Sequence, residues 1–198
     1  MVEKRDPSGE RKIRADAARN RQSLLAAAKR VFAEKGSDAS LDEIARAADV
    51  GIGTLYRHFP TRDALIEAVY RHETQNLADA AARLADEHPP VEALRAWMKL
   101  FVDHMATKQM MAEALNALVG GASDLYAAST HQMKDAIGML IDRAVADGSI
   151  DPEIAPFDLL RAVAGVAYVG AESNWQESAN RLVDILIAGL RTSGDNRS

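Results

Sequence analysis

Hydrophobic positions along the chain recur at intervals of three and four residues, the spacing that places side chains on one face of an α-helix. The first such stripe predicts a helix over about 21–35 and consists of Leu24, Leu25, Ala28, Val31 and Phe32. Asn20 is placed to cap this helix, and Gly36 is placed to end it in a left-handed conformation. The chain also holds 37 alanines and six prolines, with few runs of β-branched residues. We therefore predict an all-α fold.

Residues 40–59 predict two short helices joined by a tight turn. Ser40 and Glu43 have the spacing of a capping box at the start of the first helix, whose buried side consists of Leu41, Ile44, Ala45 and Ala48. The turn is Asp49-Val50-Gly51. Two helices joined by so short a turn form the helix-turn-helix arrangement of DNA-binding proteins.

Residues 51–59, GIGTLYRHF, are the predicted recognition helix. At about 100° per residue, Leu55 and Phe59 fall together on the face toward a core, with Ile52 close by. The opposite face consists of Gly53, Thr54 and Arg57, flanked by Tyr56 and His58. Hydroxyl, guanidinium, phenol and imidazole groups reach base edges and phosphate oxygens. A helix this short depends on packing by its neighbours.

The next helix is predicted to begin after Thr61, a good N-cap, with Asp63 in its first turn. Unbroken to Glu87 it would have about 26 residues and a length of about 39 Å. Further helices are expected over about 91–107, 110–119, 122–146, 157–173 and 177–192. We predict three parts: a disordered basic N-terminal arm (1–19), a helix-turn-helix DNA-binding domain (20–68) and a helical C-terminal domain (69–198).

Composition narrows the class of protein. Apolar residues make up 47% and charged residues 27% of the sequence, and cysteine is absent, which excludes disulfides and thiolate metal sites. No N-terminal apolar run resembles a signal peptide, and the longest apolar run, 162–171, is too short to span a bilayer. We expect a cytoplasmic protein.

The net charge of -5 argues at first against a nucleic-acid partner, but the charge is unevenly distributed. Residues 1–73 hold 14 Lys and Arg against 12 Asp and Glu, whereas residues 74–198 hold 10 against 17. The basic excess therefore coincides with the predicted DNA-binding part. The N-terminal arm contributes Lys4, Arg5, Arg11, Lys12, Arg14 and Arg19. This arm is either an ordinary disordered tail or a phosphate-binding arm.

The segment from about Asn20 to Val69 resembles the TetR family of one-component transcriptional regulators. The resemblance rests on LLAAAKRVFAEKG and SLDEIARAADVGIGTLYRHFPTRDAL, above all on GTLYRHF followed closely by a basic residue, Arg62. It implies about nine helices, the first three binding DNA, and a C-terminal domain with a ligand cavity and a four-helix dimer interface. It also implies a homodimer on a palindromic operator in double-stranded DNA, most often a repressor that a small molecule releases.

The resemblance assigns DNA contacts residue by residue. Phosphate or groove contacts are implied for Thr54, Tyr56, His58 and Arg62, base-edge contacts for Ile52, Gly53 and Arg57, and a backbone contact for Arg21. Two positions depart from the family pattern. Asp49 stands where Gly is usual, and Asp adopts a left-handed conformation less readily than Gly. Gly51 stands where Ser is frequent. Ile52 would contact a thymine methyl group or pack into the core, and both interpretations stay open.

The C-terminal part carries no assignable motif. Its large or adaptable side chains are candidates for lining a ligand cavity, although the same spacing suits a hydrophobic core. The candidates are Trp97, Phe101, Met105, Met111, Leu115, Tyr126, Met133, Tyr168 and Trp175, with His104, Asn116, Gln132 and Glu172 as polar contacts.

The last two helices are apolar over most of their surface or carry flat, small-residue faces. Such helices are central in a domain or are covered by a partner. We favour a dimer interface over a closed domain core, because helix-turn-helix proteins usually act as two-fold dimers. The candidate interface residues are Ala162, Gly165, Val166, Val169, Leu182, Ile185, Leu186 and Leu190.

A catalytic function finds little support in the sequence. The five histidines are scattered, none has a metal-ligand spacing, and there is neither a glycine-rich phosphate loop nor a nucleophile motif. We predict no catalytic residue, no metal and no cofactor. Two other classes stay open: a helical enzyme that keeps GTLYRHF only as scaffold, and a helical module that binds protein instead of DNA. The choice between repressor and activator is open as well.

Overall fold

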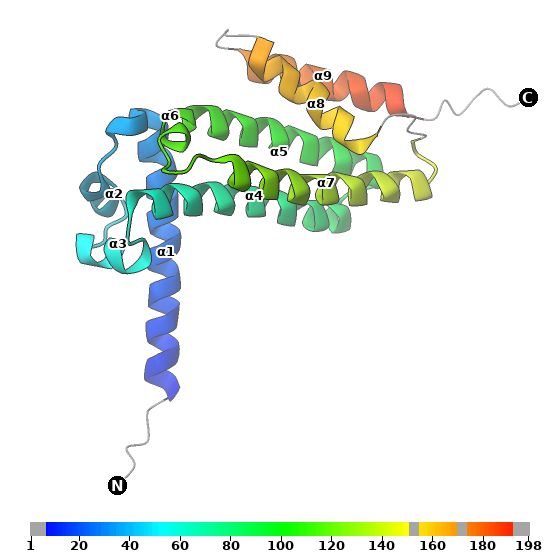
Figure 1. Ribbon diagram of the computed structural model, residues 1–198. Helices are drawn as coiled ribbons and strands as arrows, with labels where there is room; N and C mark the ends of the chain where they lie inside the picture. The colour runs from blue at the N-terminus through cyan, green and yellow to red at the C-terminus, as the bar shows by residue number, and fades with distance from the viewer. Residues whose placement is uncertain (1–6, 151–154, 170–173, 192–198) are drawn as a thin grey trace, which may run out of the picture. The chain divides into compact units, whose positions relative to one another are not determined.

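The computed structural model describes residues 7–150, 155–169 and 174–191, and the side chains of 14–150, 155–167 and 174–191. Over these residues the chain forms nine α-helices, one short 3₁₀ turn and no β-strand, which confirms the predicted all-α class (Figure 1). The chain divides into two compact units. The N-terminal unit comprises residues 1–70 and 110–122, and the C-terminal unit comprises residues 71–109 and 123–198.

The N-terminal unit is built from short helices packed on one long one. Its elements are α1 (Pro7–Lys35), the 3₁₀ turn η1 (Gly36–Asp38), α2 (Leu41–Ala47), α3 (Ile52–His58), the first turns of α4 (Arg62–Glu87) and α6 (Ala112–Asn116). The largest fully buried side chains of the first four helices and of the α3 C-cap are Leu24, Phe32, Ile44, Leu55, Phe59, Leu65 and Ile66. The predicted core faces of α1 and α3 are therefore right, whereas on α2 Ile44 and Ala45 are buried and Leu41 and Ala48 are only half-buried.

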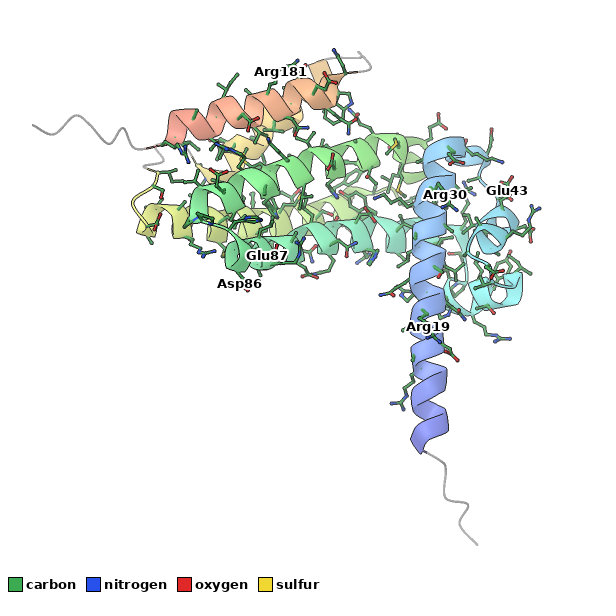
Figure 2. All side chains as sticks on the ribbon, turned by 180° about the vertical axis from the view of Figure 1, so that it is seen from behind. Arg19, Arg30, Glu43, Asp86, Glu87 and Arg181 are labelled. Carbon is green, nitrogen blue, oxygen red and sulfur yellow. The ribbon has the colours of Figure 1, made fainter. Side chains whose placement is uncertain are left out.

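Helix α1 is longer than predicted. It begins at Pro7 instead of near Arg21, so Asn20 lies inside the helix and residues 7–19 are helical, not disordered. No hydrophobic stripe marks this extension, because its described side chains are mostly exposed, as Figure 2 shows for Arg19. A helix already nucleated by packing at 24–35 extends without a second nucleation cost. Proline is tolerated in the first turn of such a helix.

Two predicted helix ends are confirmed. Gly36 follows α1 with a φ of 54°, the left-handed conformation that a Cβ atom disfavours. Thr61 caps α4 through its Oγ1, which accepts a hydrogen bond of 3.0 Å from the backbone N–H of Ala64. Helix α4 has the predicted 26 residues.

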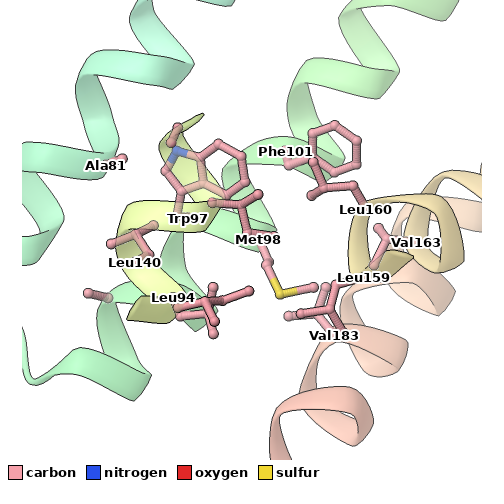
Figure 3. Close-up of a cluster of buried hydrophobic side chains, with 14 of the residues drawn as sticks. Ala81, Leu94, Trp97, Met98, Phe101, Leu140, Leu159, Leu160, Val163 and Val183 are labelled. Atoms are coloured by element: carbon pink, nitrogen blue, oxygen red, sulfur yellow. The ribbon is translucent and has the colours of Figure 1, made fainter. Parts of the chain in front are cut away.

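The C-terminal unit is a bundle around one tryptophan. It contains the rest of α4 together with α5 (Pro90–Met110), α7 (Ser123–Ala146), α8 (Pro156–Val169) and α9 (Trp175–Leu190). Trp97 is fully buried, and its Nε1 donates a 2.7 Å hydrogen bond to the carbonyl of Leu77. Leu94, Met98, Leu140 and Val183 belong to the same cluster of buried side chains, so α5, α7 and α9 contribute to one core (Figure 3).

Helix α6 belongs to a different unit from the one its position in the sequence suggests. Residues 110–122 were expected within the C-terminal domain, yet the structure packs them with the N-terminal residues. Met111 and Leu115 are fully buried there. The expected boundary near residue 68 lies close to the observed one at Tyr70.

Within the described ranges no helix combines the length and apolarity needed to cross a membrane.

Candidate DNA-binding site and family of the chain

The helix-turn-helix is held by local hydrogen bonds from the predicted residues. The Ser40 Oγ accepts a bond of 3.2 Å from the Glu43 N–H, and a Glu43 carboxylate oxygen accepts one of 3.2 Å from the Ser40 N–H. This completes the predicted capping box. In the turn, Asp49 has a φ of 56°. Asp at the position where the family usually has Gly therefore adopts the left-handed conformation that the turn needs.

Helix α3 presents a defined outward face. Gly51 is its N-cap and accepts a bond of 2.8 Å from the Thr54 N–H. Leu55 is fully buried, whereas Tyr56 is 50% exposed and Ile52 is 36% exposed. Ile52 is therefore not part of the core of its unit, and its contact with a thymine methyl group stays a prediction. The remaining members of this face are Gly53 and Arg57, which are exposed, and Thr54 and His58, which are half-buried.

Gly53 is not required by the packing of its own unit. A Cβ atom built on it would meet no heavy atom within 4 Å, and its backbone has no positive φ. The fold leaves open space there, so α3 can approach a partner closely along this side.

Arg21 and Arg62, both implied as DNA contacts by the resemblance, have different environments. The exposed Arg21 guanidinium lies 4.7 Å from the centre of the Phe59 ring, at the C-terminal end of α3. The half-buried Arg62 guanidinium instead donates to the backbone carbonyls of Gly36, Ser37 and Ala39. Of these two arginines, Arg21 is therefore the one whose guanidinium is exposed to solvent or a polyanion beside α3.

Glu43 also joins α2 to the end of α1. Its carboxylate forms an ion pair with the Lys35 ammonium group and accepts the Ser40 N–H. The hydrogen bond from Lys35, followed by that from the Ser40 backbone, lowers the pKa of Glu43 below its usual value. The carboxylate is therefore charged at neutral pH and supports both helices.

Sequence reasoning missed two acidic residues that tie the segment 110–122 to the start of the chain. A Glu113 carboxylate oxygen accepts a bond of 3.4 Å from the Ser37 N–H. Asp63 accepts a bond of 3.1 Å from the Val119 N–H. The partners are 76 and 56 residues apart, so no local pattern could have indicated either contact.

The candidate ligand residues do not form one group. Trp97, Phe101, Met105 and Met133 lie in the core of the C-terminal unit, and the partly buried Trp175 packs against it. Met111 and Leu115 are buried in the N-terminal unit instead. The side chain of Tyr168 and the whole of Glu172 lie outside the described residues. For the first four residues the structure thus shows the core role that the sequence left open.

Polar groups do enter the C-terminal unit. His104, Thr74 and Ser129 are buried, and the hydroxyl oxygens of Thr74 and Ser129 lie 3.4 Å apart. The Lys108 ammonium nitrogen lies 4.0 Å from the centre of the Tyr126 ring, and burial lowers the pKa of Lys108. Gln132 donates to Gln75 at 3.2 Å, whereas Asn116 is exposed. In the sequence of a long amphipathic helix, each of these residues looks like an ordinary exposed polar residue, so its burial could not be predicted.

The dimer candidates are partly exposed. Ile185 is 66% exposed on α9, and Ala162 is exposed on α8. Gly165, Val166, Leu182, Leu186 and Leu190 are half-buried. Of these, Val166, Leu186 and Leu190 pack against the core of their own unit. Val169 falls in α8, but its side chain lies outside the described residues.

Among the side chains that the structure describes, no group of three or more His, Asp or Glu is arranged to hold a metal ion.

Comparison with known proteins identifies the family. The family model "Bacterial regulatory proteins, tetR family" matches residues 24–69. A second one, "Transcriptional regulator SbtR-like, C-terminal domain", matches residues 89–192, more than half of the chain. The chain belongs to the TetR family. As a TetR-family protein it is a DNA-binding transcriptional regulator and not an enzyme.

Solved and curated relatives match most of the chain. The structure of the TetR regulator SCO0520 from Streptomyces coelicolor is 46% identical, with 88% of this chain and 99% of that one covered and a TM-score of 0.80. A TetR regulator from Mycobacterium vanbaalenii is 31% identical over 91% of this chain and 99% of that one, with a TM-score of 0.72. The transcriptional repressor KstR of Rhodococcus jostii is 26% identical, with 96% and 91% of the two chains covered.

Proposed function

We propose that this TetR-family chain is a homodimeric repressor that binds a palindromic operator and is released from it by a small molecule. The observation that carries the proposal is the outward face of α3, where an exposed isoleucine, an exposed arginine and an exposed tyrosine surround a glycine with open space above it. Ile52 and Tyr56 lie one turn apart on α3, so together they offer a partner an apolar contact surface.

The chemistry of this face suits the major groove. Arg57 can donate two hydrogen bonds to a guanine, and Ile52 can contact a thymine methyl group. Gly53 lets the backbone of α3 come close to the base edges. Thr54, Tyr56 and His58, at the flanks, have groups that suit phosphate oxygens, as does the exposed guanidinium of Arg21.

A dimer supplies the second recognition helix. One α3 of seven residues reads few base pairs, and two-fold dimers place two such helices about 34–36 Å apart in successive major grooves. The exposed Ile185 and Ala162 on the last two helices support an isologous interface there. We propose that this interface also includes Gly165, Val166, Leu182, Leu186 and Leu190, together with Val169.

The basic N-terminal arm is a further proposed DNA contact. The extension of α1 belongs to the same unit as α3, and Arg14, Arg19 and Arg21 are all exposed. On this helix Arg14 and Arg21, seven residues apart, fall on nearly the same side, whereas Arg19 lies on another side and pairs with Asp16. Each phosphate contact that these cations make would release counterions.

A small-molecule effector would act by preferring one state of the dimer. It must bind the state with wrongly spaced recognition helices more tightly than the DNA-bound state, since equal affinity shifts nothing. We expect its contacts among the residues of the C-terminal unit outside the proposed dimer interface. Tyr126, Lys108 and His104 would supply polar or cationic groups there. Such a regulator would bind chromosomal DNA, which in bacteria lies in the cytoplasm.

The proposal is tested by selecting bound duplexes from a random DNA pool and titrating the selected duplex at several salt concentrations. A palindrome and a steep fall of affinity with salt are expected. Arg57→Ala should weaken binding and relax preference at particular base pairs, whereas Tyr56→Phe should weaken binding to all sequences alike. Arg83→Ala, which removes an exposed arginine from α4, is the control and should change neither.

If the selection enriches no DNA sequence at any salt concentration, the proposed function is contradicted. Equal loss on every operator variant for Arg57→Ala would contradict the base-reading role alone.

A further inference from the structure

Arg62 is the basic residue that follows the recognition-helix motif, and its side chain is turned into its own unit. We infer that Arg62 positions the recognition helix by holding the α1–α2 turn and that it does not bind a DNA phosphate. The inference rests on the proposed DNA-binding function of α3 and changes the role that the resemblance implies for this residue.

Three backbone carbonyls receive the Arg62 guanidinium. Its Nη2 donates to Ser37 at 2.9 Å and to Gly36 at 3.3 Å, and its Nη1 donates to Ala39. All three acceptors belong to the segment that joins α1 to α2. Gly36 and Ala39 are buried, so their carbonyls have little access to water that would replace this donor.

An aromatic ring completes the site. The Arg62 Cζ lies 5.1 Å from the centre of the Phe32 ring, and Phe32 is fully buried in the core of the unit. A cation over an aromatic face at this distance is attracted to it. The guanidinium is thereby fixed on its face by Phe32 and on its edge by the carbonyls, which leaves it poorly placed for an external phosphate.

The position of Arg62 in the chain explains how this contact reaches α3. Arg62 is the first residue of α4, and only Phe59, Pro60 and Thr61 separate it from the end of α3. At its other end α3 is joined to α2 by the turn at Asp49. Holding the start of α4 against the start of α2 therefore fixes both ends of a helix that has only seven residues and cannot maintain its orientation alone.

The geometry also requires arginine. A planar guanidinium offers donors in a fixed fork, so it can bond several carbonyls while its face lies on a ring. A lysine ammonium is a single point charge, which satisfies a phosphate but does not span this set of acceptors. The two roles for Arg62 therefore make opposite predictions for the conservative substitution Arg62→Lys.

The experiment compares wild type, Arg62→Lys, Arg62→Ala and Arg30→Ala on the duplex that the wild type selects from a random pool. Affinity is measured across salt concentrations, at a temperature where circular dichroism shows every variant to be folded. Arg30→Ala removes an exposed cation from α1 of the same unit and controls for general loss of charge.

Positioning predicts that both Arg62 variants lose affinity by about tenfold or more, the equivalent of one charge-assisted hydrogen bond. The slope of log K against log salt should stay at the wild-type value, since no phosphate contact is lost.

A phosphate contact predicts instead that Arg62→Lys binds like wild type and that Arg62→Ala reduces the slope by about 0.9 per subunit. That result would overturn the inference, as would wild-type affinity in both folded variants, which would limit Arg62 to fold stability. Failure of the wild type to bind any duplex would overturn the proposed function itself, so the two failures are distinguishable.

Discussion

Gly36→Ala tests the junction between α1 and α2 in two ways at once. Gly36 has a φ of 54°, and a Cβ atom there would overlap a carboxylate oxygen of Glu113 and lie 3.0 Å from its Cδ. The left-handed conformation costs an L-residue about 1–2 kcal/mol, of which roughly 0.5–1 kcal/mol is offset because alanine loses less backbone entropy on folding than glycine. The backbone part of the cost is therefore about 1 kcal/mol.

The overlap with Glu113 adds a second part. The carboxylate is the far end of a flexible side chain and can move, but it then leaves the Ser37 N–H that it accepts at 3.4 Å. Losing one such bond at the surface costs at most about 1 kcal/mol. We expect Gly36→Ala to destabilise the protein by about 1–2 kcal/mol, which for a chain of this size lowers Tm by about 2–8 °C.

The assay is a double-mutant cycle of Gly36→Ala and Glu113→Ala. The stability of each of the four proteins is measured by thermal unfolding at the same protein concentration. In the Glu113→Ala background the second part should vanish, so Gly36→Ala should cost only about 1 kcal/mol. Gly148→Ala is the matched control, because Gly148 has a φ of 75° with open space around it. Its cost should be the same in both backgrounds. An equal cost of Gly36→Ala in both backgrounds would refute the crowding argument, and no cost in either would refute the backbone argument.

Three further predictions concern other parts of the chain. The pKa of Glu43 in the folded protein is below its usual 4.5, so the Glu43–Lys35 ion pair stabilises the fold above about pH 4.5. This stabilisation is lost as the pH falls through the pKa of Glu43 in the folded protein. Glu43→Gln should therefore flatten the acid dependence of Tm between pH 7 and pH 3. Ile185→Glu should produce monomers in sedimentation experiments, whereas Val145→Glu, on an exposed residue of α7, should leave the dimer intact; a dimer in both would contradict the proposed interface. The double substitution Arg14→Ala and Arg19→Ala should reduce the salt slope of operator binding without changing the selected sequence, and an unchanged slope would remove these two arm residues from the DNA contacts.

Local patterns predicted most of the helices and several of their ends, although not the start of α1. The stripe from Leu24 to Phe32, the Ser40–Glu43 capping box and the Thr61 cap each depend on residues within about eight positions of one another, and each is present in the structure. The wheel of α3 placed Leu55 and Phe59 correctly in the core. It left Ile52 undecided, because Ile52 falls at the edge of the apolar face and only the packing of neighbouring helices decides its exposure.

Contacts between distant segments could not be predicted. The direction of the Arg62 side chain depends on the positions of the backbone carbonyls of Gly36, Ser37 and Ala39. A local sequence motif gives no information about the positions of such distant groups. The same holds for Glu113, whose partner is 76 residues away. The extension of α1 gives no such signal for another reason, because an exposed helical arm has no buried stripe of apolar residues.

The N-terminal unit is assembled from two pieces of chain, residues 1–70 and 110–122. This matters for anyone who exchanges operator specificity between TetR-family regulators. A hybrid joined once, after residue 70, would present the donor's Ser37 N–H and Asp63 carboxylate to a foreign segment at 110–122, which need not carry a carboxylate at position 113 or place the backbone N–H of position 119 beside Asp63. A faithful graft needs three joints, at 70, 109 and 122, so that the recognition module is transplanted with both of its segments.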